Sequence, residues 1–190
     1  MSISRRTSKL EKTEKKLKSW RMESRRMITK VDEWQIEPYL DLLAAAEHVR
    51  LDRRLPDHDE WLRNRVHLHF ARGAQFFGYH AEEECEPTGI VVILHEEAPS
   101  GIPTLGARGE ILDIAVSEQL RRKGVGSILL AHAEKVLRER CVYCMFAMTA
   151  ADDYDVIAFY GKNGLVPVAT LPDVYGQGYE GNIFLRKILR

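Results

Sequence analysis

Residues 110–126 read EILDIAVSEQLRRKGVG, and the two halves of this stretch differ in character. The first half is aliphatic and β-branched, which predicts a strand over residues 110–116. After the second half, apolar residues recur at helical spacing from Val125 to Leu137 and predict a helix. A basic turn that contains two glycines therefore connects a predicted strand to the start of a predicted helix.

This turn has the features of an anion-binding site. Glycines let the backbone approach an oxyanion closely, and the free N–H groups at the start of a helix point toward it. The helix macrodipole adds partial positive charge there, and the side chains of Arg121, Arg122 and Lys123 add more. We therefore expect a phosphate or pyrophosphate ligand, the alternative being a simple surface turn before a helix.

Two widespread phosphate-binding motifs do not describe the turn. The chain contains no Gly-x4-Gly-Lys-Ser/Thr string, which excludes a Walker loop. A dinucleotide-binding fingerprint requires a third glycine at the position that Leu129 occupies. The pattern that does match is Arg/Gln-x-x-Gly-x-Gly/Ala, over residues 121–126.

That pattern resembles the pyrophosphate-binding loop of the GNAT superfamily of N-acetyltransferases, which bind acetyl-coenzyme A. A second motif, AFYGKNGL over residues 158–165, is similar to the helix-to-strand segment of the same family and follows the first at the family's spacing. The resemblance covers residues 74–190, and residues 28–73 more loosely. The sequence departs from the family pattern at Asp153, where Asn is frequent, and at Leu165, where Phe is usual.

The resemblance implies an α/β protein with the GNAT (acyl-CoA N-acyltransferase) fold, a central, mostly antiparallel mixed sheet flanked by helices. We expect an N-acetyltransferase domain over residues 27–190, preceded by a basic extension over residues 1–26. The sequence patterns predict strands over residues 27–31, 75–83, 89–95, 110–116, 142–149, 166–171 and 183–188, and helices over residues 32–49, 57–72, 125–137 and 152–162.

The family also implies which residues meet the cofactor. The backbone of the strand that ends at Val116 would pair with the pantetheine arm as an added strand would. The basic turn would hold the pyrophosphate, and the helix after residue 151 would close the other side. The residues expected to bind acetyl-CoA are Ile114, Ala115, Val116, Arg121, Arg122, Lys123, Gly124, Val125, Gly126, Ser127, Asp153 and Tyr160.

Acyl transfer to an amine requires that the amine lose a proton and that the leaving thiolate gain one. In the family a tyrosine often donates to the sulfur, and Tyr160 matches its position; a phenol with an ordinary pKa of about 10 is a competent donor. Glu110 resembles the general-base glutamate of the histone-acetylating branch. Asp113 should face the other side of the strand because side chains alternate, and it is the alternative base if the register differs.

The resemblance therefore implies transfer of an acetyl group from acetyl-CoA to a primary amine by direct attack, with no metal. A non-catalytic acyl-CoA-binding sensor or scaffold is the alternative. The acceptor stays open between a protein N-terminus or lysine and a small-molecule amine. Its pocket would be built by the first two helices and the loop between the last two strands, which hold Trp34, Tyr39, Arg53, Arg54, Trp61, Tyr175 and Tyr179.

The net charge of the 190 residues is zero, but residues 1–30 hold eleven Lys and Arg against three Glu, so the remainder is acidic. The basic extension is read first as a solvated or disordered segment, next as a helix docked on the domain or on a second copy in a homodimer, and last as a nucleic-acid contact. The apolar runs are too short to span a membrane.

The three cysteines do not form a disulfide framework, which favours a reducing, cytoplasmic location. Cys141 and Cys144 have the spacing of a metal or redox motif. No second cysteine pair accompanies them, so we expect both to be buried free thiols. His67 and His69 would lie on different sides of a helix and are expected at its surface or in the substrate pocket.

Overall fold

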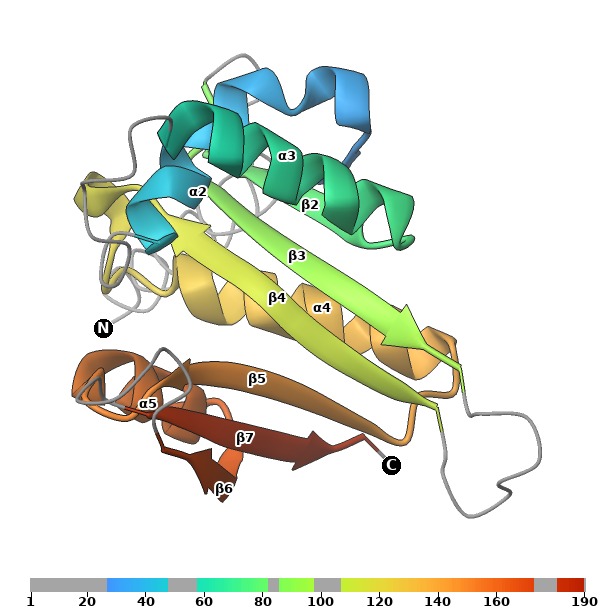
Figure 1. Ribbon diagram of the computed structural model, residues 1–190, viewed down its shortest axis with the longest axis vertical. Coiled ribbons are helices and arrows are strands. Elements are labelled where there is room, and N and C mark those ends of the chain that lie inside the picture. Colours follow the sequence, from blue (N-terminus) through green and yellow to red (C-terminus); the bar gives the residue numbers. More distant parts are fainter. Residues whose placement is uncertain (1–26, 48–57, 82–85, 98–106, 173–180, 190) are drawn as a thin grey trace, which may run out of the picture.

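The computed structural model describes residues 27–47, 58–81, 86–97, 107–172 and 181–189 (Figure 1). These residues form a seven-stranded sheet in the order β1-β2-β3-β4-β5-β7-β6. All neighbouring strands are antiparallel except β4 and β5, which are parallel. The strands are β1 Met27–Val31, β2 Gln75–His80, β3 Gly89–Glu96, β4 Arg108–Val116, β5 Cys144–Ala150, β6 Val166–Leu171 and β7 Asn182–Ile188.

Helices cover both faces of the sheet, and two apolar clusters separate the layers (Figure 1). One cluster joins the sheet to α4 and α5, and the other joins it to α2 and α3. The mostly antiparallel mixed sheet with helices on both faces confirms the predicted fold class. The helices are η1 Glu33–Gln35, η2 Glu37–Tyr39, α2 Leu40–Glu47, α3 His58–Ala71, η3 Glu118–Leu120, α4 Val125–Glu139 and α5 Tyr154–Lys162.

The predicted continuous helix over residues 32–49 is wrong. The chain instead forms the two short turns η1 and η2 before α2 begins at Leu40, and residues 48 and 49 lie outside the described part. Pro38 stands at the start of η2, and a proline has no N–H to continue a helix that began before it. Asp32 and Gln35 close a capping box around η1, which ends that first turn separately.

Strand β4 contains a bulge that decides where its side chains point. Val92 pairs with Asp113, but the next residue of β3, Ile93, pairs with Ile111, so Leu112 is an extra residue. Before the bulge, Ile111 joins the cluster under α4, and a Cβ on Gly109 would strike Leu137 of α4. After the bulge, the alternation of side chains between the two faces is reversed.

Beyond Leu112, the side chains of Asp113 and Ala115 lie on the face covered by α3 and α2. Glu110 alternates with Gly109 and Ile111, so it lies on this face as well. The expectation that Glu110 and Asp113 point to opposite faces is therefore wrong, because strict alternation does not hold across a bulge.

Strands β4 and β5 pair only over the first part of β4. Their register ends at Ile111 and Ala147, after which the two strands diverge (Figure 1). β5 continues beside β7 up to Ala150. Among the described residues, the second half of β4 therefore has no strand partner on its β5 side, and this free edge leads directly into the basic turn.

Candidate active site

The basic turn after β4 is shaped by two residues in the left-handed region. Arg122 has φ 61° and Gly124 has φ 88°. Gly124 is the N-cap of α4, and no described side chain caps that helix. Its first backbone hydrogen bond runs from Ile128 N–H to Gly124 O, at 3.0 Å. The N–H groups of the first turn are therefore directed out of the helix toward any anion above the turn.

The start of α4 packs closely against α5. A Cβ on Gly126 would lie 3.1 Å from Cε2 of Phe159 and 3.9 Å from Cγ2 of Val116. A larger residue at this position would push into the junction of β4, α4 and α5. Packing therefore favours a very small residue at position 126, whereas Gly124 is favoured by its positive φ.

The side chains of the turn reach its two borders. Arg121 donates from Nε to the carbonyl of Val116, at 3.1 Å, and closes the turn onto the end of β4. Arg122 donates to Asp155 in the first turn of α5, at 2.9 Å between Nη2 and Oδ2. Arg121, Arg122, Lys123 and Gly124 are all exposed, so cationic groups and open backbone coincide at this end of β4.

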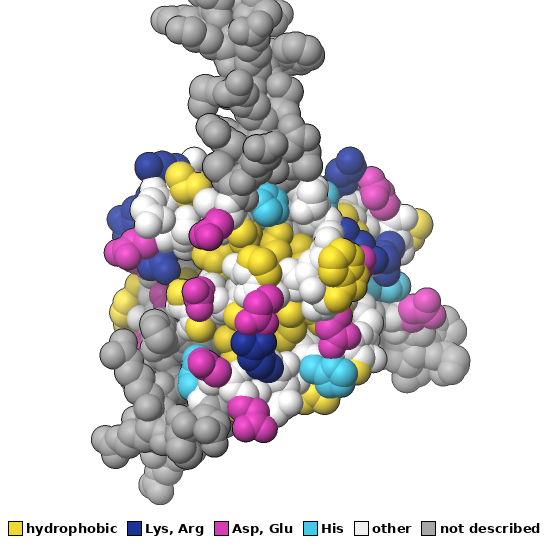
Figure 2. Space-filling view, turned by 90° about the horizontal axis from the view of Figure 1, so that it is seen from above, with side chains coloured by type: hydrophobic (Ala, Val, Ile, Leu, Met, Phe, Trp, Pro, Cys, Tyr) yellow, Lys and Arg dark blue, Asp and Glu magenta, His cyan; other side chains and the backbone are white. Residues whose placement is uncertain are grey.

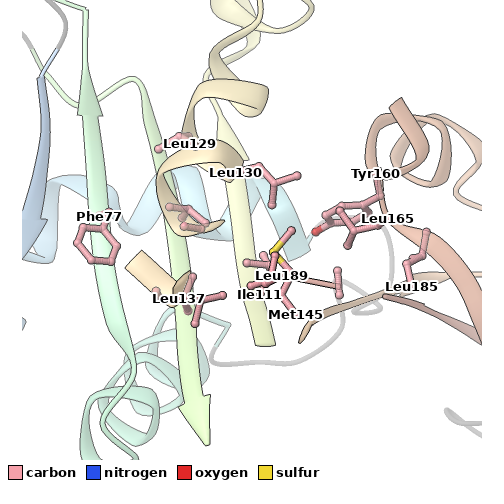
Figure 3. Close-up of a cluster of buried hydrophobic side chains, with 14 of the residues drawn as sticks. Phe77, Ile111, Leu129, Leu130, Leu137, Met145, Tyr160, Leu165, Leu185 and Leu189 are labelled. Carbon is pink, nitrogen blue, oxygen red and sulfur yellow. The ribbon is translucent and has the colours of Figure 1, made fainter. Parts of the chain in front are cut away.

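Tyr160 lies on α5 across from the free edge of β4. It is 4% exposed, and its ring sits in the cluster between the sheet and the helices α4 and α5, with the hydroxyl directed toward β4 (Figure 3). Burial raises the pKa of this phenol, and the negative charges of Asp113 and Asp153 raise it further. The expectation of an ordinary pKa is therefore wrong, and the hydroxyl stays protonated at any ordinary pH.

Asp153 uses its carboxylate to begin α5. Its Oδ1 accepts a hydrogen bond from the N–H of Val156, at 3.1 Å, which is the usual bond of an acidic N-cap. The side chain is thus engaged within its own helix in this structure. Its charge also acts on Tyr160, as described above.

Glu110 is half-buried on the face of β4 that α3 covers. Burial is the main cause that raises the pKa of its carboxyl, and the nearby carboxylate of Glu96 raises it further. The cations Arg72 and Arg108 act in the opposite direction, and Asp113 adds to the increase. A carboxyl with a raised pKa is a better proton acceptor than an exposed one once it is ionised.

Asp113 is more deeply buried than Glu110 and is already paired. Its Oδ1 accepts from Nη2 of Arg65 at 2.9 Å, and its side chain is 5% exposed. His69 Nε2 lies 3.8 Å from the other carboxylate oxygen. Sequence reasoning did not single out Arg65, although Trp61, Arg65 and His69 recur at intervals of four residues and so share one side of α3.

The predicted acceptor-pocket residues differ in their surroundings. Trp34 is 80% exposed on η1, whereas Tyr39 is buried and its hydroxyl is 2.9 Å from Nε2 of His80. Trp61 lies with its ring 5.8 Å from the guanidinium carbon of Arg65. His67 is on the surface, where it contacts Glu33. Arg53, Arg54, Tyr175 and Tyr179 lie outside the described residues.

The two cysteines of the predicted thiol pair are not alike. Cys144 is buried in β5 and confirms the expectation, but Cys141 is exposed and contradicts it. Cys141 adopts φ 56° at the residue after the cap of α4, and this turn directs it to solvent. Among the described residues, no group of three or more His, Cys, Asp or Glu side chains could hold a metal ion. None of the described helices is long and apolar enough to cross a membrane.

Comparison with known proteins gives consistent results. The model of the acetyltransferase (GNAT) family matches residues 28–165. Over 76 residues, or 40% of the chain, the sequence is 40% identical to the tRNA(Met) cytidine acetyltransferase TmcA of Aeropyrum pernix. The match spans only 10% of the length of that relative.

Solved structures of the same family superpose over most of the chain. The ribosomal-protein-alanine N-acetyltransferase of Brucella melitensis gives a TM-score of 0.64 at 25% identity, covering 86% of this chain and 99% of that one. A GNAT family acetyltransferase of Elizabethkingia anophelis, solved with acetyl-CoA bound, gives 0.63 at 18% identity, with coverages of 87% and 99%. At this identity the second likeness concerns the fold alone.

Proposed function

This chain belongs to the GNAT family of acetyltransferases, and from that premise we propose that it acetylates a primary amine by direct attack on acetyl-CoA. The observation that carries the proposal is the arrangement around the divergence of β4 and β5. Glu110 lies on one face of β4, Tyr160 faces its other side, and the free edge between them leads to the open start of α4. The proposed acid Tyr160, the proposed base Glu110 and the proposed anion site in the basic turn therefore all border β4.

The residues at the end of β4 fit acetyl-CoA. Acetyl-CoA supplies an activated thioester and carries a pyrophosphate. The N–H groups of Val125, Gly126 and Ser127 and the cations Arg121, Arg122 and Lys123 would bind the pyrophosphate. The backbone of Ile114, Ala115 and Val116 on the free edge would hold the pantetheine arm and offer an N–H to the developing oxyanion. Asp153 would border the site from α5, with its carboxylate retained as the helix cap.

The chemical roles follow from the protonation states. Glu110 accepts the proton of the incoming ammonium group, which it does only when ionised, so activity requires a pH above its raised pKa. Tyr160 remains protonated, and its hydroxyl would donate a hydrogen bond to the departing thiolate, although the raised pKa works against complete transfer of the proton. We propose Glu110 over Asp113 as the base, since the Asp113 carboxylate is paired with Arg65 and nearly inaccessible.

The acidic residues on the helical segments support a cationic amine as the acceptor. The helical segments on the acceptor face carry acidic residues in their first turns. Figure 2 shows acidic side chains spread around a central group of apolar ones, with basic side chains interspersed among the described residues. Such a surface favours a cationic amine over a polyanion. The residues concerned are Glu33, Glu37, Asp41, Asp59 and Glu60.

RNA cytidine is the second candidate acceptor, because the curated relative that shares 40% identity is a tRNA cytidine acetyltransferase. The exocyclic amine of cytidine is uncharged at neutral pH and need not lose a proton before it attacks. An enzyme for cytidine would therefore depend less on Glu110. Acceptor class and Glu110 dependence are thus linked, and they can be tested together.

The test measures coenzyme A release from acetyl-CoA with three acceptor groups: peptides with free N-terminal alanine or lysine, small aliphatic amines, and unmodified tRNA. The proposal expects release with a member of the first two groups and little with tRNA. Release of coenzyme A with tRNA alone would show that RNA cytidine, and not an aliphatic or peptide amine, is the acceptor. Tight acetyl-CoA binding without release for any acceptor would favour the non-catalytic sensor or scaffold.

A further inference from the structure

A buried ion pair joins α3 to β4 beside the proposed reaction centre. Arg65 donates to Asp113 across 48 residues of sequence, at 2.9 Å, with side-chain exposures of 23% and 5%. The Trp61 ring lies beside the guanidinium, and His69 lies beside the carboxylate. The pair thus sits in an enclosed position that solvent screens only weakly.

Stability alone does not account for such a pair. Burying two charges costs desolvation energy, and apolar residues of similar volume often serve a fold equally well. Asp113 also reaches this face only because Leu112 forms a bulge, which disrupts the ladder between β3 and β4. Bulges of this kind often re-aim a side chain next to an active site. The bulge brings the carboxylate to the face that also carries Glu110.

We infer that Arg65 and Asp113 are a positioning pair, in which Arg65 offsets part of the charge of Asp113 and thereby limits the negative charge that Glu110 and Tyr160 face. The inference rests on the proposed roles of Glu110 as base and Tyr160 as acid. With the pair intact, Arg65 offsets part of the negative charge of Asp113, and the remainder still raises the pKa of both Glu110 and Tyr160. Without Arg65, the base would face an uncompensated anion, and without Asp113 it would face an uncompensated cation.

Other charged groups also face these residues. Glu96 of β3, Arg108 of β4 and Arg72 at the end of α3 act on Glu110, in addition to its burial. Asp153 acts on Tyr160 together with Asp113. These groups stay in place when Arg65 or Asp113 is substituted. They therefore set the pKa values of Glu110 and Tyr160 in the wild type, and not the direction in which a substitution shifts them.

His69 is a third titratable group beside the pair, since its Nε2 lies 3.8 Å from the Asp113 carboxylate. Its burial lowers the pKa of the imidazole, Asp113 raises it, and Arg65 and Arg72 lower it. Loss of Arg65 would therefore favour a protonated His69, which could replace part of the missing charge. The Arg65 variants must be made both with His69 and with His69→Gln.

The experiment measures the acid limb of kcat/KM against pH in the full chain, with the best acceptor found. Arg65→Met should move the limb to higher pH, because removal of a cation disfavours the ionised Glu110. Asp113→Asn should move it to lower pH, because removal of an anion favours that form. We expect shifts of about half a pH unit in opposite directions. Damage to the fold would not give opposite signs.

Matched controls separate charge from packing. Arg65→Lys keeps the charge and should leave the limb near that of the wild type. Arg63→Met removes an arginine of the same helix that pairs with Glu37 at the surface, and it should cause no shift. If Arg65→Met does not fold, Asp113→Asn is compared with the double variant Arg65→Met/Asp113→Asn. Loss of the cation should still move the acid limb of kcat/KM to higher pH in the double variant.

Glu110→Gln distinguishes the two levels of the account. An acid limb that persists in Glu110→Gln would overturn the proposed base. If Glu110→Gln removes the limb but the Arg65 and Asp113 variants leave it in place, or shift it in the same direction, the base stands and the positioning pair is wrong. Opposite shifts together with loss of the limb in Glu110→Gln support both.

Discussion

The two sides of β4 are built in different ways. On the cofactor side, the end of the strand, the basic turn and the start of α4 are contiguous in sequence, and the groups that would bind pyrophosphate are mainly backbone N–H groups. On the proposed acceptor side, the arrangement depends on side chains from α3 and β4 that are about 40 to 50 residues apart, such as Arg65 and Asp113.

This difference shows which kind of site can be recognised from a local sequence pattern. A backbone site needs only particular angles and small residues, and these follow from the spacing of glycines. A side-chain site depends on which face each residue takes, and a single extra residue in β4 changes that face. The same contrast predicts how the two sides respond to substitution.

The largest effect is expected on the acceptor side. Glu110→Gln should lower kcat/KM by about 100- to 10,000-fold, the usual range for a general base, while the affinity for acetyl-CoA should hardly change. Because the pKa of Glu110 is raised in the folded state, its ionised form at pH 7 costs stability. The variant should therefore melt at or above the wild-type temperature. A clear loss of stability with full activity would make Glu110 a structural residue.

On the cofactor side, Gly126→Glu should weaken acetyl-CoA binding by about 100-fold or more, measured by calorimetry. The new side chain would collide with Phe159 and place a negative charge beside the pyrophosphate. Gly161→Glu is the matched control, because it adds the same charge on α5, where a Cβ meets nothing within 4 Å. Equal affinities for a folded Gly126→Glu and the wild type would remove the pyrophosphate from this turn.

A substitution of Tyr160 tests the proposed acid, which lies between the cofactor side and the acceptor side of β4. Tyr160→Phe keeps the buried ring and removes only the hydroxyl, so kcat should fall by about 10- to 1,000-fold. The KM for acetyl-CoA and the melting temperature should change little. Wild-type turnover in steady-state assays would leave Tyr160 as a packing residue alone.

The smallest effect is expected from deletion of residues 1–26, which lie outside the described part of the chain. The residues that we assign to the two sides of β4 all come from η1 and later elements, so we expect folding and acetyl-CoA affinity to be nearly unchanged. Any self-association through the basic segment should weaken with salt, since exposed charges are screened over about 10 Å at 0.1 M. Sedimentation at low and high salt measures this. A truncated protein that does not fold would place the domain boundary elsewhere.

The contrast between the sides also explains what the sequence could predict. The strand, the turn and the helix of residues 108–139 follow from local patterns, as does the position of Tyr160 after its own motif. Pro38 was a readable signal against one helix over residues 32–49. The exposure of Cys141 depends on a left-handed residue after α4, for which a cysteine gives no local sign.

The bulge at Leu112 could not be read from the sequence. Residues 110–116 are uniformly apolar apart from Glu110 and Asp113, and nothing in them marks an extra residue. The register that defines it comes from pairing with β3, which is a long-range contact. Without the bulge, the common face of the two carboxylates and the role of Arg65 could not be inferred.

We propose that acetyl-CoA lies along the free edge of β4 with its thioester between Glu110 and Tyr160. A crystal structure of the complex with coenzyme A tests it most directly. The account predicts the pyrophosphate on the N–H groups of Val125–Ser127 and the sulfur within about 3.5 Å of the Tyr160 hydroxyl. Coenzyme A bound away from this edge, or a sulfur out of reach of that hydroxyl, would contradict it.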